Sequence, residues 1–153
     1  KDMIGVEVGG ATKNVLAIGA GISDGLGFGA NTRIAMMTRG LIEMTRLGIA
    51  LGAQKDTFIG LSGMGDLVLT CSDDQSRNRR FGLGLADGTA IEGLRKSIGQ
   101  VVEGYYAARA VHKVAETLGV DMPIVEQIYK VIYEHLAPEE AVANLLKRPL
   151  TPE

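Results

Sequence analysis

The sequence predicts an all-α fold. Apolar residues recur at spacings of three and four along most of the chain, which is the period of an amphipathic helix. Prolines and glycines stand where helices are expected to begin and end. No alternating βαβ pattern and no internal repeat is found. Of the 153 residues, 46% are hydrophobic and 22% charged, which suffices for a core, so we expect one helical domain over residues 1–153.

The N-terminal residues give a weak strand signal. Residues 4–8 (IGVEV) alternate in polarity, so we expect residues 1–8 to form a short edge strand or the end of a linker. An apolar helix should follow, because Ala11, Val15 and Ile18 fall on one helix face.

The start of this helix also resembles the first strand and glycine turn of a dinucleotide-binding fold. Residues 14–21 (NVLAIGAG) have the apolar run and the glycines, and Glu43 falls where an acid would bind a ribose. However, Asp24 stands where the next glycine belongs, and no further βα unit follows to build a sheet. We therefore interpret the segment as helix.

Two helices are expected in the middle of the chain. Residues 31–51 carry apolar side chains at helical spacing, with Asn31 as N-cap and Gly52 just past the last turn. Residues 89–92 (TAIE) match a capping box, which predicts a short helix that ends at Gly99.

The C-terminal third should contain three more helices. One spans about residues 102–118 and ends at Gly119. Pro123 and Pro138 each suit the first turn of a helix, because proline has no N–H to leave unpaired there. Residues 148–153 contain two prolines and should fray.

Composition excludes several classes of function. The net charge of −2 gives no basic field for nucleic acid, and no stretch reaches the roughly 18 apolar residues of a membrane span. We expect no signal peptide, and the single Cys71 excludes an internal disulfide, so a cytoplasmic protein is predicted. His112 and His135 lack metal-ligand spacing.

Glycine is abundant, with 21 glycines against 4 prolines. Because glycine has no Cβ, many glycines indicate either close approach between segments or backbone lying against a ligand. Helix caps and short turns are the alternative explanation, and we expect them to account for more than half.

Lys13 is the first candidate catalytic residue. It stands near the expected start of an apolar helix, where the helix dipole and the apolar surroundings both disfavour the ammonium form. A lysine perturbed in this way can act as an acid or a base. A solvated helix lysine is the alternative.

Asp66 and Thr70 form a second candidate cluster. They lie one helical turn apart on the same face, after flexible glycines. A carboxylate there can hold an ammonium group or a hydroxyl, or it can cap a helix whose Leu67 and Val68 enter the core. Cys71 is interpreted as a buried apolar residue.

A third cluster carries three arginines within four residues. Residues 76–80 (SRNRR) combine guanidinium groups with a hydroxyl and an amide, which suits a phosphate dianion. A solvated charge run is the alternative explanation.

Taken in order, five motifs resemble one family. The chain carries GATKNV at residues 10–15, GLGFGAN at 25–31, GDL with TC at 65–71, SRNR at 76–79 and GQVVEG at 99–104. They are similar to the C-terminal domain of NAD(P)-dependent glycerol-3-phosphate dehydrogenase, the last motif to its bacterial form in particular. The resemblance runs from about Ile4 to Leu146.

The resemblance implies a helical domain of the 6-phosphogluconate-dehydrogenase-like type, without the Rossmann domain that precedes it in the family. It implies interconversion of dihydroxyacetone phosphate and glycerol 3-phosphate with NAD or NADP and no metal, for glycerophospholipid synthesis. Lys13 would be the catalytic acid/base. The substrate would be bound by six residues, namely Lys13, Asp66, Thr70, Ser76, Arg77 and Asn78. The cofactor would be contacted by Arg77, Val101 and Glu103.

The resemblance also names partners. The family's own N-terminal Rossmann domain would cover this domain, no nucleic acid would bind, and a homodimer is left open. Two other functions remain: a two-domain dehydrogenase acting on another hydroxy acid or sugar acid, and a helical interaction module without enzymatic activity. A panel of substrates would distinguish the other dehydrogenase from a glycerol-3-phosphate dehydrogenase. If no phosphate-bearing ligand changed the spectrum or the melting temperature of the domain, the interaction module would be favoured.

Overall fold

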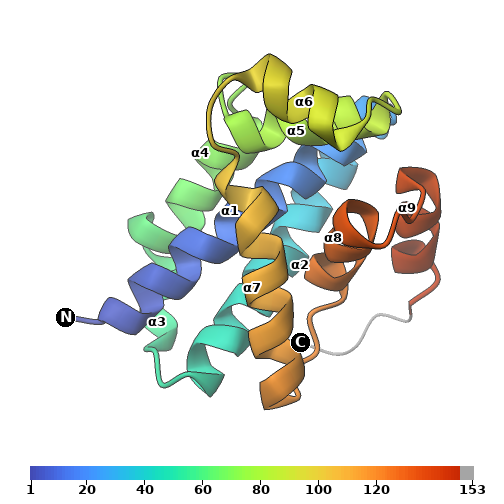
Figure 1. Ribbon diagram of the computed structural model, residues 1–153. Coiled ribbons are helices and arrows are strands. Elements are labelled where there is room, and N and C mark those ends of the chain that lie inside the picture. The colour runs from blue at the N-terminus through green and yellow to red at the C-terminus, as the bar shows by residue number, and fades with distance from the viewer. Residues whose placement is uncertain (149–153) are drawn as a thin grey trace.

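The structure is a computed structural model that describes residues 1–148, and these residues are helical with no strand among them. Helix α1 (Met3–Gly25) crosses the middle of the molecule, with α7 on the near side and α8 and α9 beyond its C-terminal half (Figure 1). The elements after α1 are α2 (Gly29–Ala50), α3 (Lys55–Ile59), the π-helical turn η1 (Leu61–Gly65), α4 (Asp66–Ser72), α5 (Arg77–Ala86), α6 (Ile91–Ile98), α7 (Glu103–Leu118), α8 (Pro123–Tyr133) and α9 (Pro138–Leu146).

Helix α1 is the core of the domain. Its residues 15–23 are buried all round, whereas most amphipathic helices bury one face. Val15, Leu16 and Ile18 lie within this stretch and are fully buried. The apolar run that resembles a dinucleotide-binding strand is thus a central helix, as we interpreted it.

Glycines let α5 lie directly on α1. A Cβ on Gly82 would stand 2.0 Å from the carbonyl oxygen of Ile18, and a Cβ on Gly21 would stand 2.1 Å from that of Arg79. Gly25 lies beside Ala86 further along, so the two helices run parallel. Close approach between segments, one of the two expected uses of glycine, is therefore found at this contact.

The expectation of a strand or linker at residues 1–8 is wrong, because α1 begins at Met3. Asp2 caps the helix, accepting a hydrogen bond from the backbone N–H of Gly5 (2.9 Å). The alternation in sequence does not reflect a strand. Gly5 is buried whereas the apolar Ile4 and Val6 are exposed, and a half-buried strand would bury the apolar side chains instead.

Two expected N-caps are also wrong. Helix α2 already begins at Gly29, so Asn31 lies inside it, and α6 begins at Ile91 without a side-chain cap from Thr89. The turn before α2 is made by Gly27 and Gly29, both with positive φ, and this turn sets its start.

The other helix ends are confirmed. Gly52 and Gly119 have positive φ just past α2 and at the end of α7, and Pro123 and Pro138 stand in the first turns of α8 and α9. Of the tail predicted to fray, residues 149–153 lie outside the described residues.

Helix α8 begins against a buried carboxylate. Glu43 of α2 is 3% exposed and accepts hydrogen bonds from the N–H groups of Ile124 (2.7 Å) and Val125 (3.2 Å). Burial raises the pKa of Glu43 from 4.5 to about 7, against the lowering effect of these hydrogen bonds and of Arg46. Glu43 thus supplies the N-terminal cap that Met122 does not provide.

We predict that Gly82→Ala destabilises the protein by at least about 2 kcal/mol, because the new methyl group meets backbone atoms that cannot move aside. Gly10→Ala is the matched control: it lies in the same pair of helices with nothing within 4 Å of its Cβ position. It should stabilise by roughly 0.5–1 kcal/mol. Urea unfolding measures both, and equal effects of the two changes would contradict the close contact.

We predict that Glu43→Gln flattens the dependence of stability on pH. Because the pKa of Glu43 is higher in the folded state, its contribution is fully present below about pH 4.5 and is lost as pH rises through about 7. The shift corresponds to roughly 3 kcal/mol. Urea unfolding between pH 4.5 and 8 should show the unfolding free energy of the unmodified protein falling relative to the variant. Parallel curves would refute this role of Glu43.

Candidate active site

A cleft of about 300 Å³ opens where α1, α4, α5 and the start of α7 meet. Its walls contain six of the eight residues that the sequence marks as site residues, namely Lys13, Thr70, Ser76, Arg77, Asn78 and Glu103. Asp66 reaches the cleft through Lys13, while Val101 does not line it. The structure also adds lining residues that the sequence did not mark: Asn14, Leu69, Asp73 and Gln75.

Lys13 and Asp66 form an ion pair at the cleft. The Lys13 Nζ donates to Asp66 Oδ2, although the two residues are 53 positions apart. Both are half-buried, with side chains 23% and 39% exposed. Asp66 is the first residue of α4 and follows the helical turn η1 without a break. The pair places one ammonium group in a fixed position on the cleft wall.

The position of Lys13 in its helix differs from the expectation. Because α1 begins at Met3, Lys13 lies near the middle of the helix, beyond the first turn over which the dipole acts. The expected influence of the dipole on Lys13 is therefore wrong, and the neighbour that matters is Asp66.

A buried phenylalanine sets the position of Asp66. The fully buried Phe58 of α3 contacts Gly48 of α2, where a Cβ would stand 2.1 Å from its ring. Gly63 packs directly on the backbone of Phe58, with 2.3 Å from its Cβ position to the carbonyl oxygen. The π-helical turn η1 is thereby pressed onto the core, and Asp66 follows it directly.

Helix α4 also carries Thr70 and Cys71. The Thr70 hydroxyl donates to the backbone carbonyl of Asp66 (2.7 Å) and lies on the cleft wall. Leu67 is buried as expected, but Val68 is 42% exposed, so only one of the two enters the core. Burial raises the pKa of the Cys71 thiol to about 12, which fits its interpretation as an apolar residue.

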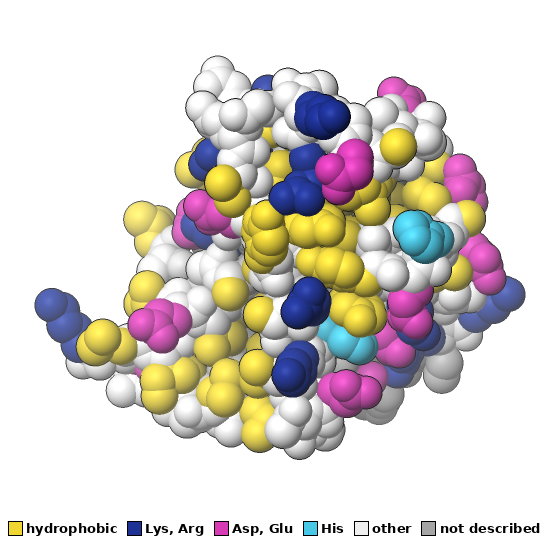
Figure 2. Space-filling model, in the orientation of Figure 1, with side chains coloured by type: hydrophobic (Ala, Val, Ile, Leu, Met, Phe, Trp, Pro, Cys, Tyr) yellow, Lys and Arg dark blue, Asp and Glu magenta, His cyan; other side chains and the backbone are white. Residues whose placement is uncertain are grey.

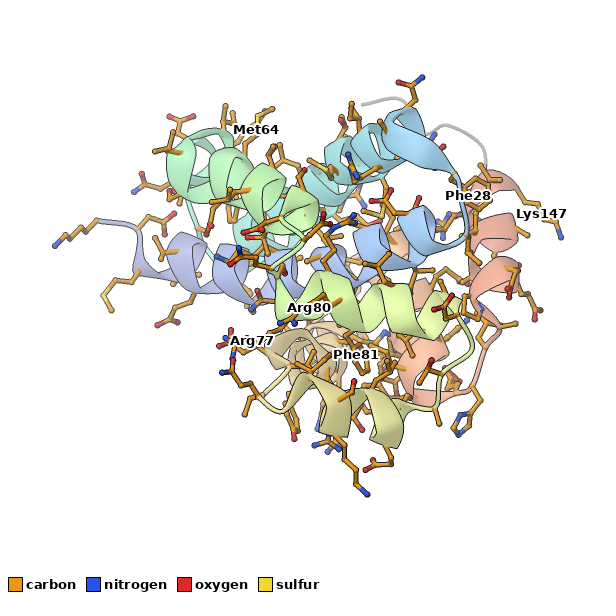
Figure 3. The ribbon with its side chains drawn as sticks, turned by 90° about the horizontal axis from the view of Figure 1, so that it is seen from above. Phe28, Met64, Arg77, Arg80, Phe81 and Lys147 are labelled. Atoms are coloured by element: carbon orange, nitrogen blue, oxygen red, sulfur yellow. The ribbon has the colours of Figure 1, made fainter. Side chains whose placement is uncertain are left out.

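The first turn of α5 forms the opposite wall. Ser76 caps it, its hydroxyl accepting from the N–H of Arg79 (3.3 Å). Arg77 lies on the wall and donates to Gln100 Oε1 (3.2 Å). In Figure 3 Arg77 and Arg80 lie at the N-terminal end of α5, far from Phe28 in the turn between α1 and α2. Of the three arginines in the string, only Arg77 lines the cleft, because Arg79 is buried and Arg80 is exposed outside it.

Asn78 and Asn14 join the walls. Asn78 Oδ1 accepts from the backbone N–H of Gly104 (2.8 Å), and its Nδ2 donates to Asn14 Oδ1 (3.2 Å). Asn14 Nδ2 donates in turn to Glu103 Oε2 (3.0 Å). In the sequence Asn14 stands out only as part of the GATKNV motif, because its partners Asn78 and Glu103 lie 64 and 89 residues away. Its position directly after Lys13 was the signal that could have marked it.

An aromatic cluster fixes the segment that leads into Glu103. Arg95 of α6 stacks on Tyr105 (4.7 Å) and donates to the Tyr106 hydroxyl (2.7 Å), and Tyr105 packs edge-on against Phe81. Figure 2 shows hydrophobic side chains gathered over this face of the molecule, among Lys and Arg side chains. Between these anchors Val101 is 62% exposed, outside the cleft wall.

Comparisons with known proteins show the family of the chain. Residues 2–143 match the family model described as the C-terminus of NAD-dependent glycerol-3-phosphate dehydrogenase. The chain belongs to this family. It is 62% identical over 152 residues to the NAD(P)+ glycerol-3-phosphate dehydrogenase of Methylococcus capsulatus, covering 99% of this chain and 45% of that protein. With the enzyme of Shewanella halifaxensis it shares 59% over 147 residues, 96% of this chain and 43% of that protein.

Solved glycerol-3-phosphate dehydrogenase structures share the fold. The crystal structure of the Coxiella burnetii protein superposes with a TM-score of 0.94 at 50% identity, over 97% of this chain and 46% of that one. The yeast protein gives a TM-score of 0.86 at 29% identity, over 97% and 43%. The chain therefore spans less than half the length of the glycerol-3-phosphate dehydrogenases it matches, and it corresponds to their C-terminal part.

The described residues 1–148 contain neither a membrane-spanning helix nor a cluster of metal-ligand side chains. No helix there is long and apolar enough to cross a membrane. Within the same residues, no three His, Cys, Asp or Glu side chains come together as a metal site would require.

Proposed function

We propose that this chain is the substrate-binding and catalytic half of a glycerol-3-phosphate dehydrogenase. The complete enzyme interconverts dihydroxyacetone phosphate and glycerol 3-phosphate, and it supplies glycerol 3-phosphate for glycerophospholipid synthesis in the cytoplasm. The observation that carries the proposal is the Lys13–Asp66 pair on one wall of a cleft whose other wall holds Arg77.

Lys13 is the proposed acid and base. Its ammonium group donates a proton to the C2 oxygen of dihydroxyacetone phosphate as a hydride reaches C2, and it takes the proton back when glycerol 3-phosphate is oxidised. Asp66 holds Nζ in place through the ion pair, which leaves the remaining N–H bonds of the ammonium to the substrate. Thr70, one turn beyond Asp66, offers its hydroxyl oxygen to a substrate hydroxyl.

The first turn of α5 is the proposed phosphate site. The first N–H groups of a helix have no partner within the helix, and those of Arg77 and Asn78 stand at this position. The Arg77 guanidinium adds a charged donor that matches phosphate geometry. The Asn78 side chain is already bonded to Gly104 and Asn14, so its proposed contribution is to hold this wall in place.

The proposed reaction uses NAD or NADP, which carries the hydride when bound, and needs no metal. The described residues contain no strand and thus no strand–turn–helix phosphate loop of the Rossmann type. At the cleft, Arg77 and Glu103 would contact the cofactor, and Glu103 is held ready by Asn14. Val101, exposed beside the cleft, would contact it only from outside the wall.

The N-terminal Rossmann domain of the family is the proposed partner. Large apolar side chains are exposed on η1 and α4 beside the cleft, among them Leu61 (91%) and Leu69 (66%). In this proposal the Rossmann domain covers this surface and excludes water from the cleft. Met64, labelled in Figure 3, lies on the same surface and is 48% exposed.

We predict that Lys13→Ala in the full-length enzyme lowers kcat for dihydroxyacetone phosphate by at least about 1000-fold, because the proton donor is lost. The rate of NADH and of NADPH oxidation measures this, with circular dichroism to show that the variant folds. Lys96→Ala, an exposed lysine on α6, is the control and should keep full activity. An unmodified enzyme that ignores dihydroxyacetone phosphate would overturn the proposed function.

We predict that the purified 153-residue chain folds but has no measurable dehydrogenase activity. Hydride transfer requires a nicotinamide held in contact distance of the substrate, and this half does not hold the dinucleotide by itself. The same NADH assay, run with the chain alone at high concentration, tests this. Clear turnover by the chain alone would refute the division of labour.

A further inference from the structure

Arg79 lies behind the proposed phosphate site and does not line it. It is 7% exposed, and its Nη1 donates to Asp24 Oδ2 (2.5 Å) while its Nε donates to Asp74 Oδ1 (3.1 Å). Asp24 stands near the end of α1 and also accepts from Arg33 of α2 (2.6 Å). One guanidinium thus joins α5 to the ends of two other helices and to the loop before it.

The two carboxylates that Arg79 contacts differ in their surroundings. The side chain of Asp24 is 12% exposed and fixed by two arginines, whereas that of Asp74 is 86% exposed. A buried guanidinium is strongly unfavourable unless it is paired, so Asp24 anchors Arg79 in the core. Through its bond to Asp74, the anchored Arg79 also holds the surface loop that precedes α5.

The loop that Asp74 belongs to forms part of the cleft wall. Its neighbours Asp73 and Gln75 both line the cleft, and Arg77 begins the next helix. The pair between Arg79 and Asp74 therefore closes a ring of six residues around the segment that carries Ser76 and Arg77. This segment must be in place before an anion arrives if the site is to be preformed.

Building on the proposed function, we propose that Arg79 is a positioning residue for the phosphate site. Its guanidinium ties residues 73–78 to Asp24, and this holds Arg77 and the first turn of α5 in the geometry that receives the phosphate. The GLGFGAN motif that follows Asp24 then has a physical purpose, because it turns the chain so that Arg33 reaches Asp24 from α2.

The test uses the full-length enzyme with Asp74→Asn and Arg79→Lys. Asp74→Asn removes a charge from an exposed side chain and should fold normally. Lysine keeps the charge of Arg79 but lacks the fork that bonds two carboxylates at once. Each variant should raise KM for dihydroxyacetone phosphate on the order of 10-fold and leave kcat within about 2-fold, because uniform binding is lost. The double variant should be no worse than the worse single variant.

Amide hydrogen exchange supplies a second readout that needs no substrate. Amides of residues 73–78 should exchange on the order of 10-fold faster in both variants, while those of α8 are unchanged. Glu92→Gln, which removes an exposed carboxylate paired with Arg95 outside the cleft, is the matched control and should alter neither KM nor exchange.

The outcomes separate the two proposals. Unchanged exchange in residues 73–78 overturns the positioning role of Arg79, whatever the kinetics show. Faster exchange with an unchanged KM overturns it as well, because the loop would then be irrelevant to phosphate binding. An unmodified enzyme without activity on dihydroxyacetone phosphate overturns the proposed function instead, and the exchange data still decide whether Arg79 holds the loop.

Discussion

The contact between α1 and α5 is the constraint on which the cleft depends. Gly21 and Gly82 bring two helix backbones to a separation that no other residue allows. Asn14 and Asn78 then face each other one turn before this contact, and Gly104 admits the start of α7 beside them. Lys13, Arg77 and Glu103 come from three distant parts of the chain, and they share a cleft because these glycines remove the side chains that would separate their helices.

Two helices, α7 and α8, take their N-terminal caps from other helices. Among the helices of residues 1–148, only α1 and α5 are capped by a preceding side chain, Asp2 and Ser76. Helix α7 is capped by Asn78, which lies 26 positions before the capped residue Gly104. Helix α8 is capped by Glu43, which lies 81 positions before Ile124. A helix that depends on a distant cap is fixed in space relative to the helix that supplies it. The cap on α7 therefore also fixes Glu103 against α5 at the cleft.

The sequence predicts features whose causes are local. Gly119, Pro123 and Pro138 mark helix ends because backbone geometry at one residue decides them. The prediction for residues 1–8 is wrong because glycine lies on the buried side of the first turns of α1. Glycine has no apolar side chain, so the helical pattern of burial cannot be recognised from the sequence there. Other features depend on residues far apart in sequence. Lys13 and Asp66 pair across 53 residues, and Arg79 is buried away from the cleft because it pairs with Asp24, 55 residues away. The family motifs indicate the candidate site residues, but the contacts between these residues could be seen only in the fold.

The charges of the cleft wall give a direction to any anionic substrate. Lys13 and Arg77 are its basic residues, while Asp73 and Glu103 are acidic. Because Asp73 bonds the N–H of Gln75 and Glu103 is held by Asn14, both carboxylates have fixed positions. In the proposed function a phosphate dianion finds donors in the first turn of α5 and in the N–H groups of Arg77 beyond the one that it donates to Gln100, whereas Lys13 already shares its charge with Asp66. In the proposed function the phosphate therefore lies at α5, and the uncharged part of the three-carbon substrate, which includes the C2 oxygen, lies beside the Lys13 ammonium, where the proposed proton transfer occurs.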